Sequence, residues 1–426
     1  MYYSHKFDQT PLFSFSSLGI DLKHDPLKIL SDKIPWDELI AAIEITYAIR
    51  GRNSNSIRMM LGLEIAKTYF KGISDVQIVQ RLSRDIGVMY VCGFEYLVTA
   101  KQLPDPSSMS VFRSHLTKEV LTRIEQLSVE ESIIHLPRKK RRQLSGDTTV
   151  LPVSVAYPTD AALVGKAVHQ LLRFMKSSKE HIAVSGKRKV LQTIQAFSKK
   201  RSHTKKMVDS HIQEVVSFAK RVVKQIHKKN ISFSRNTRGI VRTIEKLLIQ
   251  QQAKLDGKKI VDRIVSIDKP YLRPIFRGKS GSPIEIGLKA GLICIGEKVL
   301  MSTHTGYENY SDTKIEKRQV QKYRKTVGHN PSEYSFDRGG DSDENHHYLA
   351  NQHITDGIQC RGKERRNIKP FIRKRLYKQR TAIERNIGHI KLSYGCDEIN
   401  YKGNNKGNNN PIRLSMAIML HNYSTY

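Results

Sequence analysis

The stretch YKQRTAIERNIGHIKL, residues 377–392, combines charged side chains with regularly spaced isoleucines in one predicted helix. Because an α-helix turns by about 100° per residue, four polar residues share one stripe about 60° wide: Tyr377, Arg380, Glu384 and Lys391. The apolar residues occupy the adjoining stripe: Leu376, Ile383, Ile387 and Ile390. This helix is therefore expected to pack on a core along one edge and to hold an acid, two bases and a phenol along the next.

The charge of the chain is strongly one-sided. Among 426 residues there are 73 Lys and Arg against 40 Asp and Glu, a formal net charge of +33. This excess favours a polyanionic partner, and double-stranded DNA fits better than a membrane, because no apolar run approaches the length of a membrane span and the N-terminus lacks a signal-peptide profile. The four cysteines lie far apart, which favours a reducing compartment. We therefore expect a cytoplasmic, nucleoid-associated protein with no membrane partner.

Residues 1–135 are predicted to form an N-terminal helical DNA-binding domain. Within it, residues 56–85 read as two helices joined by a tight turn, in which Gly72 supplies backbone freedom and Ser74 and Gln77 form a capping box. A helix–turn–helix can place a helix in the DNA major groove, although an ordinary helical bundle explains the pattern equally well.

A basic run, PRKKRRQL at residues 137–144, follows this domain. The pattern fits a solvated linker and a clamp on the DNA backbone about equally. The clamp interpretation assigns DNA contacts to five residues: Arg138, Lys139, Lys140, Arg141 and Arg142.

Residues 136–426 are expected to form an α/β catalytic domain with a mixed sheet. A strand is predicted to begin at Asp147, and residues 283–296 and 298–307 read as antiparallel strands joined near Gly296. A helix over 311–328, with Ser311 as N-cap and Gly328 past its end, then leads to further strands ending at Asp337 and starting near residue 354. The helix quoted above and an apolar helix at residues 410–426 close the chain.

A very basic segment interrupts this domain at about residues 166–262. Residues 166–259 contain 24 Lys and Arg against five Asp and Glu. A disordered basic tail would lack the helical apolar spacing seen in VVSFAKRVVKQI and VRTIEKLLIQQQ, so we expect an inserted helical subdomain.

Three carboxylates are placed to converge in such a fold. Asp147 and Asp337 lie at the ends of predicted strands, and Glu384 projects from the helix. Carboxylates held close together repel one another, and a divalent cation removes that repulsion. Mg²⁺ prefers oxygen ligands, and two such ions can activate the attacking oxygen and stabilise the leaving oxygen in phosphodiester chemistry.

The polar stripe of the helix suggests how DNA would be held beside these carboxylates. Arg380 and Lys391 are expected to contact phosphates, and Tyr377 to hydrogen-bond to a phosphate or stack on a base. Nearby acids offer alternative metal ligands: Asp160, Asp341 and Asp343. His346 and His347 are interpreted as surface or supporting residues, because no third histidine lies at ligand spacing.

At these residues the chain resembles bacterial insertion-sequence transposases of the DDE type, which have a ribonuclease H-like catalytic core. The spacing Y-x₂-R-x₃-E-x₆-K is present over 377–391. Residues 146–172 and 335–345 are similar to the family's first and second aspartate segments, and residues 51–82 resemble its N-terminal helical domain. The likeness is weakest over 170–260.

The resemblance implies that Asp147, Asp337 and Glu384 form a metal-binding triad. It implies two Mg²⁺ ions, for which Mn²⁺ is expected to substitute, and DNA cleavage and strand transfer at the ends of a mobile element. The assembly is expected to be a homo-oligomer on terminal inverted repeats and target DNA. One departure is Gly340, which stands where the family commonly has an aromatic residue.

Two alternatives remain open from the sequence. The first is a two-metal nuclease on the same core that hydrolyses nucleic acid without joining ends. The second is a catalytically inactive DNA-binding relative, which the basic surface alone would support.

Overall fold

The computed structural model describes residues 14–48, 54–153, 155, 159–177, 184–276, 284–362, 368–397 and 409–426. The chain divides into two compact units. The sheet unit comprises Met1–Val153, Leu288–Gly306 and Tyr310–Tyr426, and the helical unit comprises Ser154–Gly287 and Tyr307–Asn309.

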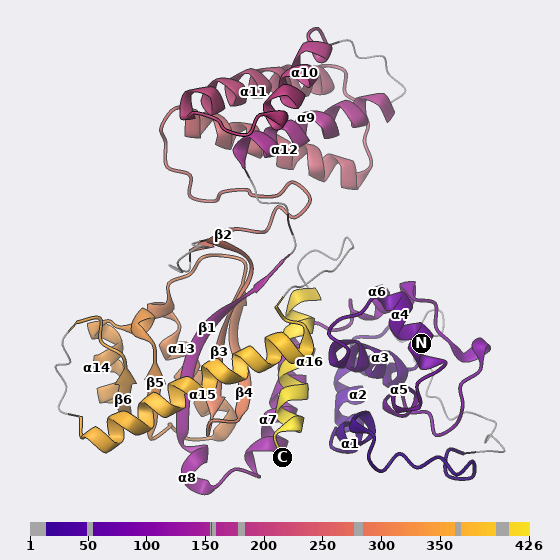
Figure 1. Cartoon of the computed structure of the whole chain (residues 1–426), viewed down its shortest axis with the longest axis vertical. Helices are drawn as coiled ribbons and strands as arrows, with labels where there is room; N and C mark the ends of the chain where they lie inside the picture. Colours follow the sequence, from indigo (N-terminus) through magenta and orange to yellow (C-terminus); the bar gives the residue numbers. More distant parts are fainter. Residues whose placement is uncertain are drawn as a thin grey trace. The chain divides into compact units, whose positions relative to one another are not determined.

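The sheet unit begins with helices, as the sequence predicts (Figure 1): α1 (Pro26–Asp32), α2 (Trp36–Glu44), α3 (Ile57–Tyr69), α4 (Asp75–Leu82), α5 (Ile86–Val91), the 3₁₀ helix η1 (Ala100–Gln102), α6 (Ser107–Phe112) and α7 (Lys118–Ile133). The capping box of Ser74 and Gln77 is confirmed at the start of α4. Gly72 has a φ of +77°, and a Cβ there would meet the guanidinium of Arg413 at 2.6 Å, so this turn has both a conformational and a steric need for glycine.

A buried network of charges joins α3, α4 and α6. Glu64, which is fully buried, accepts from Arg113 Nε at 3.1 Å. Arg113 also binds Asp75, whose Oδ1 lies 2.6 Å from Lys67 Nζ. Opposite charges this far from water must stay paired, so the network fixes how these three helices pack.

The sheet is mixed, and its strands follow a short basic helix, α8 (Arg138–Arg141): β1 (Gln143–Pro152), β3 (Ile284–Ile295), β4 (Val299–Gly306), β5 (Glu333–Phe336) and β6 (Thr355–Ile358). Within the sheet unit the order is β4-β3-β1-β5-β6, with β5 parallel to both β1 and β6 and with β3 and β4 antiparallel. The predicted hairpin at Gly296 is confirmed, with a φ of +59°. A short strand, β2 (Pro274–Phe276), pairs with the first residues of β3 inside the helical unit.

The prediction that a strand starts at Asp147 is wrong by four residues. β1 begins at Gln143, so Asp147 lies inside the strand, because Gln143 to Ser145 pair with β5 although their sequence carries little β-branched signal. Of the rest of the predicted strand, residues 154, 156 and 157 lie outside the described part of the chain.

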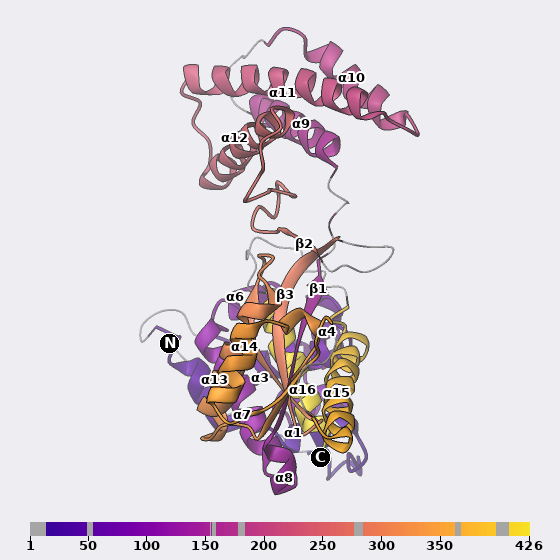
Figure 2. The ribbon, with the colours of Figure 1, turned by 90° about the vertical axis from the view of Figure 1, so that its left-hand side faces the viewer.

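Helices cover both faces of the sheet (Figure 2): α13 (Glu316–Val327) and α14 (Asp343–Asn351) lie on one face, and α15 (Pro370–Tyr394) lies on the other. Gly328 ends α13 in the left-handed conformation, as predicted. Ser311 instead directly precedes the short 3₁₀ helix η2 (Asp312–Lys314), so its predicted place at the start of the longer helix is wrong. A second 3₁₀ helix, η3 (Arg338–Gly340), follows β5 directly.

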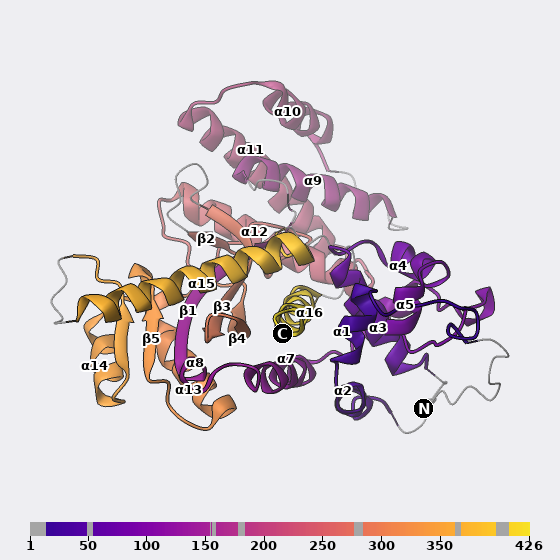
Figure 3. The same ribbon diagram turned by 60° about the horizontal axis from the view of Figure 1, so that its bottom comes forward.

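The edge strand β4 is covered by α7 and by α16 (Asn409–Ser424), which lies between the sheet and the N-terminal helices (Figure 3). The amide of Asn422 exchanges two hydrogen bonds with the backbone of Leu300, at 2.8 and 2.9 Å. Glu125 of α7 accepts from Ser302 N at 2.8 Å. Polar side chains thereby occupy the open edge of the sheet.

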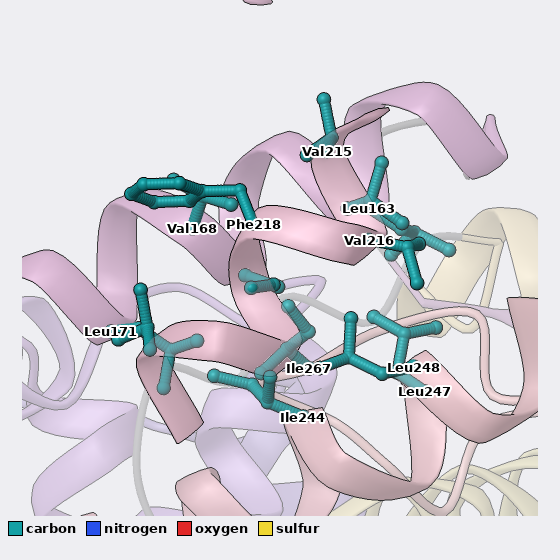
Figure 4. Packing of buried hydrophobic residues seen from close by; sticks show 14 of the residues in the cluster. Leu163, Val168, Leu171, Val215, Val216, Phe218, Ile244, Leu247, Leu248 and Ile267 are labelled. Atoms are coloured by element: carbon teal, nitrogen blue, oxygen red, sulfur yellow. The ribbon is translucent and has the colours of Figure 1, made fainter. Parts of the chain in front are cut away.

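In its described residues the helical unit contains four α-helices: α9 (Asp160–Ser177), α10 (Lys187–Lys199), α11 (Lys205–Lys228) and α12 (Arg235–Leu255). Its core includes Val168, Phe218 and Leu247 (Figure 4). Asp160 is buried and binds Lys254 and Arg263, which gives it a structural role within this unit. In the described part of the chain, no helix has both the length and the apolar character needed to cross a membrane.

We expect Glu64→Ala to lower the free energy of unfolding by about 3 kcal/mol, because Arg113 would keep a buried charge without one of its carboxylates. Urea unfolding followed by the fluorescence of Trp36, the single tryptophan, measures this directly, since Arg58 of α3 stacks on its ring. The control is Glu130→Ala in an exposed ion pair, expected to cost less than about 1 kcal/mol. Equal losses for the two variants would contradict the role of the buried network.

Candidate active site

The pairing of β1 with β5 brings the two predicted aspartates together. The strands run parallel with Ser145 opposite Ser335. Asp147 and Asp337 each follow two residues later, and Asp337 still has an extended backbone, with φ −78° and ψ −178°. They therefore occupy equivalent positions on neighbouring strands, whose spacing is about 4.8 Å.

Both aspartates face the side of the sheet that α15 covers. Glu333 of β5 accepts from Arg375 of α15 at 2.9 Å, whereas its neighbour Tyr334 donates to Gln319 of α13 at 2.5 Å. Successive residues of a strand point to opposite faces, so Asp337 lies on the face of Glu333.

The same alternation holds in β1. A Cβ on Gly146 would meet the hydroxyl oxygen of Tyr334 at 2.6 Å and would overlap Gln319 Oε1, so Gly146 faces α13. Asp147, the next residue, therefore points toward α15.

Helix α15 crosses the sheet from β6 to β3 (Figure 1). Leu376 packs on Gly357 of β6, Gln379 donates to Glu333 of β5, and Asn386 Nδ2 lies 3.3 Å from the Cys294 sulfur of β3. Along α15, Glu384 lies between Gln379, which contacts β5, and Asn386, which contacts β3. The backbone of Glu384 therefore lies over the region of β5 and β1.

The two predicted stripes of α15 are confirmed in part. The apolar residues are buried: Leu376, Ile383, Ile387 and Ile390. On the adjoining stripe, the Arg380 guanidinium lies 5.3 Å from the centre of the Tyr377 ring and forms an ion pair with Glu384. The Glu384 side chain is 48% exposed, and Lys391 is partly exposed further along the helix.

This polar stripe points toward the carboxyl ends of β5 and β6. Tyr377 and Arg380 line a cavity of about 280 Å³ together with Arg373 and with Arg338, the residue after Asp337. Glu384 continues the same stripe by one turn. Asp147 and Asp337 thus share one face of the sheet, Glu384 lies on the helix that covers this face, and arginines line the cavity next to Asp337.

On the opposite face, a glutamate that the sequence did not reveal lies beneath Asp337. Glu316 is fully buried on α13, and among the described residues neither of its carboxyl oxygens has a hydrogen-bond partner. Burial, and after it the negative charges of four nearby aspartates, raise the pKa of Glu316 to about 9: Asp356, Asp337, Asp341 and Asp312. Four carboxylates thus lie close enough to Glu316 to disfavour its ionisation, and a bound cation would reduce their mutual repulsion.

Glu316 also explains Gly340. A Cβ at Gly340 would overlap Glu316 Oε1, so the aromatic residue that the resemblance leads one to expect has no room here. Glu316 lies in the charged stretch EKRQVQKYRK, where nothing in the local sequence predicts burial. Its burial depends on Gly340, which is 24 residues away.

The alternative ligands have different surroundings. Asp343 is exposed in the first turn of α14, and His347 is exposed, as expected for a surface residue. His346 is instead partly buried between Asp341 and Asp356, with nitrogen–oxygen distances of 2.9 and 2.5 Å.

The basic run at α8 precedes β1, so it lies toward the end of that strand opposite to its carboxyl end. Lys140 forms an ion pair with Glu297 at 2.5 Å, and Arg141 donates to the carbonyls of Ile134 and Leu136. Three of the five predicted DNA contacts are exposed: Arg138, Lys139 and Arg142. Their DNA-binding role stays a prediction.

Comparison of the sequence with known proteins indicates the family of the chain. Residues 18–115, which include α1 to α6, match the family described as "Transposase domain (DUF772)". The chain is also 31% identical over 150 residues to "Uncharacterized protein ORF8 in nfe locus" of Rhizobium meliloti, a region that covers 34% of this chain and 71% of that protein. The chain belongs to a transposase family. No solved structure shows significant similarity to this chain.

The residues that match the transposase domain and the residues of the candidate carboxylate site lie in different parts of the chain. The matched segment ends before α7, whereas Asp147, Asp337 and Glu384 all follow it. The family indicates a DNA-modifying function related to transposition, and the chemistry has to be argued from the site.

We expect the stability of the protein to fall as pH rises from about 4.5 to about 9 in a chelator, because Glu316 ionises at its ordinary value in the unfolded chain and at about 9 in the folded chain. The isosteric variant Glu316→Gln removes this proton and should show a flatter profile over that range, measured as the urea midpoint at each pH. Glu344→Gln, an exposed neighbour on α14, is the control. Parallel profiles for wild type and Glu316→Gln would contradict the burial of a neutral Glu316.

Proposed function

We propose that this protein is a DDE transposase with a ribonuclease H-like core, which cleaves DNA at the ends of an insertion sequence and transfers the ends to target DNA. The observation that carries the proposal is the equivalent placement of Asp147 and Asp337 on neighbouring parallel strands, with Glu384 on the helix that covers the same face. The match of residues 18–115 to a transposase domain supports the substrate class.

The donor set fits Mg²⁺. Asp147, Asp337 and Glu384 offer carboxylate oxygens, the ligands that Mg²⁺ prefers. When bound, a pair of Mg²⁺ ions supplies activation of the attacking oxygen and stabilisation of the leaving oxygen. Mn²⁺, which accepts the same ligands, is proposed to substitute.

The protein's own part of the reaction is to hold and orient DNA. Arg338, Arg373 and Arg380 line one cavity and can bind phosphate oxygens through charge-assisted hydrogen bonds. Tyr377, 58% exposed, presents a ring on which a base can stack. Arg380 also pairs with Glu384, so it positions that carboxylate along the edge.

Three substitutions test the proposed triad. Asp147→Asn, Asp337→Asn and Glu384→Gln should each abolish Mg²⁺-dependent cleavage of a duplex that carries the DNA flanking the reading frame, because each removes a charged metal ligand. Binding to the same duplex, measured by gel shift in a chelator, should remain within about threefold of wild type, since phosphate contacts dominate affinity.

Asp343→Asn is the matched control, because Asp343 is an exposed acid six residues from Asp337. Cleavage retained by all three triad variants would refute the proposal. Adding a 3′-hydroxyl end to the assay separates a transposase from a nuclease on the same core, since only the transposase forms joined product.

The cavity arginines should contribute to DNA affinity individually. We expect Arg373→Ala to lower the slope of log affinity against log salt by about 0.9, the value for one lost phosphate contact. The control is Lys374→Ala, the exposed neighbour that does not line the cavity. Identical slopes for these two variants would place DNA elsewhere.

A further inference from the structure

Three side chains of different chemistry meet at the carboxyl ends of β5 and β6. Asp341, His346 and Cys360 each offer one ligand atom, and the three atoms lie within 4.8 Å of one another. They come from the turn after η3, from α14 and from the segment after β6. We propose that these residues bind one transition-metal ion of the Zn²⁺ class, at a site distinct from the proposed Mg²⁺ ligands.

The spacing of the donors suits a small tetrahedral ion. Ligands about 2.0–2.3 Å from a zinc ion are themselves about 3.3–3.8 Å apart. His346 Nε2 lies 2.9 Å from Asp341 Oδ1, and because no separation within the group is above 4.8 Å, none exceeds the tetrahedral spacing by more than about 1 Å. Small side-chain rotations therefore allow all three atoms to reach one ion and leave a fourth position for water.

Hydrogen bonds outside the group already orient two of the donors. His346 Nδ1 lies 2.5 Å from Asp356 Oδ2, so a carboxylate directs the other ring nitrogen toward the site, as is usual for metal-binding histidines. The backbone N–H of Arg361 donates to Asp341 Oδ2 at 2.6 Å, on the oxygen that does not face His346. Asn345 anchors the intervening turn by donating to the Gly340 carbonyl at 2.9 Å.

The donor types select the metal. A thiolate and an imidazole favour Zn²⁺ over Mg²⁺, whereas the carboxylates of the proposed catalytic site favour Mg²⁺. Cys92, Cys294 and Cys396 are buried, and Cys360 is partly exposed. An imidazolium between Asp341 and Asp356 would explain the two ion pairs without a metal, and metal binding by Cys360 distinguishes the two interpretations.

A metal at this position would link three segments around the second aspartate. Asp341 follows Asp337 by four residues, and the ion would tie its turn to α14 and to the end of β6. The ion would act by restraining the backbone that carries Asp337, so the inference goes beyond the proposed reaction.

Metal titration of the full-length protein tests this site without DNA. The protein is stripped with a chelator, kept in excess Mg²⁺ to fill oxygen-only sites, and titrated with Zn²⁺ and separately with Co²⁺. We expect one Zn²⁺ per chain by mass spectrometry and a thiolate-to-cobalt charge-transfer band. Zn²⁺ should also slow alkylation of Cys360 by iodoacetamide at least about tenfold, because the thiolate would be coordinated.

Two variants and one control identify the ligands. Cys360→Ser should eliminate the charge-transfer band, and His346→Gln should weaken Zn²⁺ binding by at least about tenfold. His347→Gln, the exposed neighbour on α14, should bind as wild type does. The proposal is overturned if Zn²⁺ leaves Cys360 alkylation unchanged, or if Cys360→Ser and His346→Gln bind Zn²⁺ as tightly as wild type. Zn²⁺ binding by Asp147→Asn, with cleavage abolished, would separate this site from the catalytic one.

Discussion

The parallel pairing of β1 with β5 is the contact on which the candidate site depends. Because Ser145 lies opposite Ser335, the register brings Asp147 and Asp337 to one level on one face, although 190 residues separate them in sequence. Two carboxylates on adjacent strands repel each other, so this arrangement lowers stability unless a cation is bound. A pairing shifted by one residue would send one aspartate to the opposite face and leave no common site.

The face covered by α13 maintains that register through close packing. Gln319 accepts from Tyr334 and donates to the carbonyl of Leu292, so one buried amide joins β5 and β3, and no side chain other than hydrogen fits at Gly146 beside it. One turn earlier, Glu316 occupies the space beneath Gly340. The carboxylate edge is thus supported from below by a helix whose buried polar groups tolerate little change in volume.

The sequence predicted the parts of this fold that depend on local periodicity. The buried stripe of α15, the capping box at Ser74 and the hairpin at Gly296 follow from residue spacing and turn chemistry. The start of β1 and the burial of Glu316 could not be predicted, because each depends on a partner far away in the chain. Convergence of Asp147 and Asp337 was predicted only on the assumption that their strands are neighbours, and the strand pairing supplies that condition. The triad's function and its metal remain predictions.

Iron-directed cleavage of the polypeptide tests the central claim most directly. When Fe²⁺ replaces Mg²⁺ in the presence of ascorbate and peroxide, hydroxyl radicals cut the backbone near the bound ion. The account predicts cuts near residues 147, 337 and 384 in the same protein, all suppressed by excess Mg²⁺. Cuts confined to one of these segments, or a pattern unaffected by Mg²⁺, would show that the three carboxylates do not share a metal.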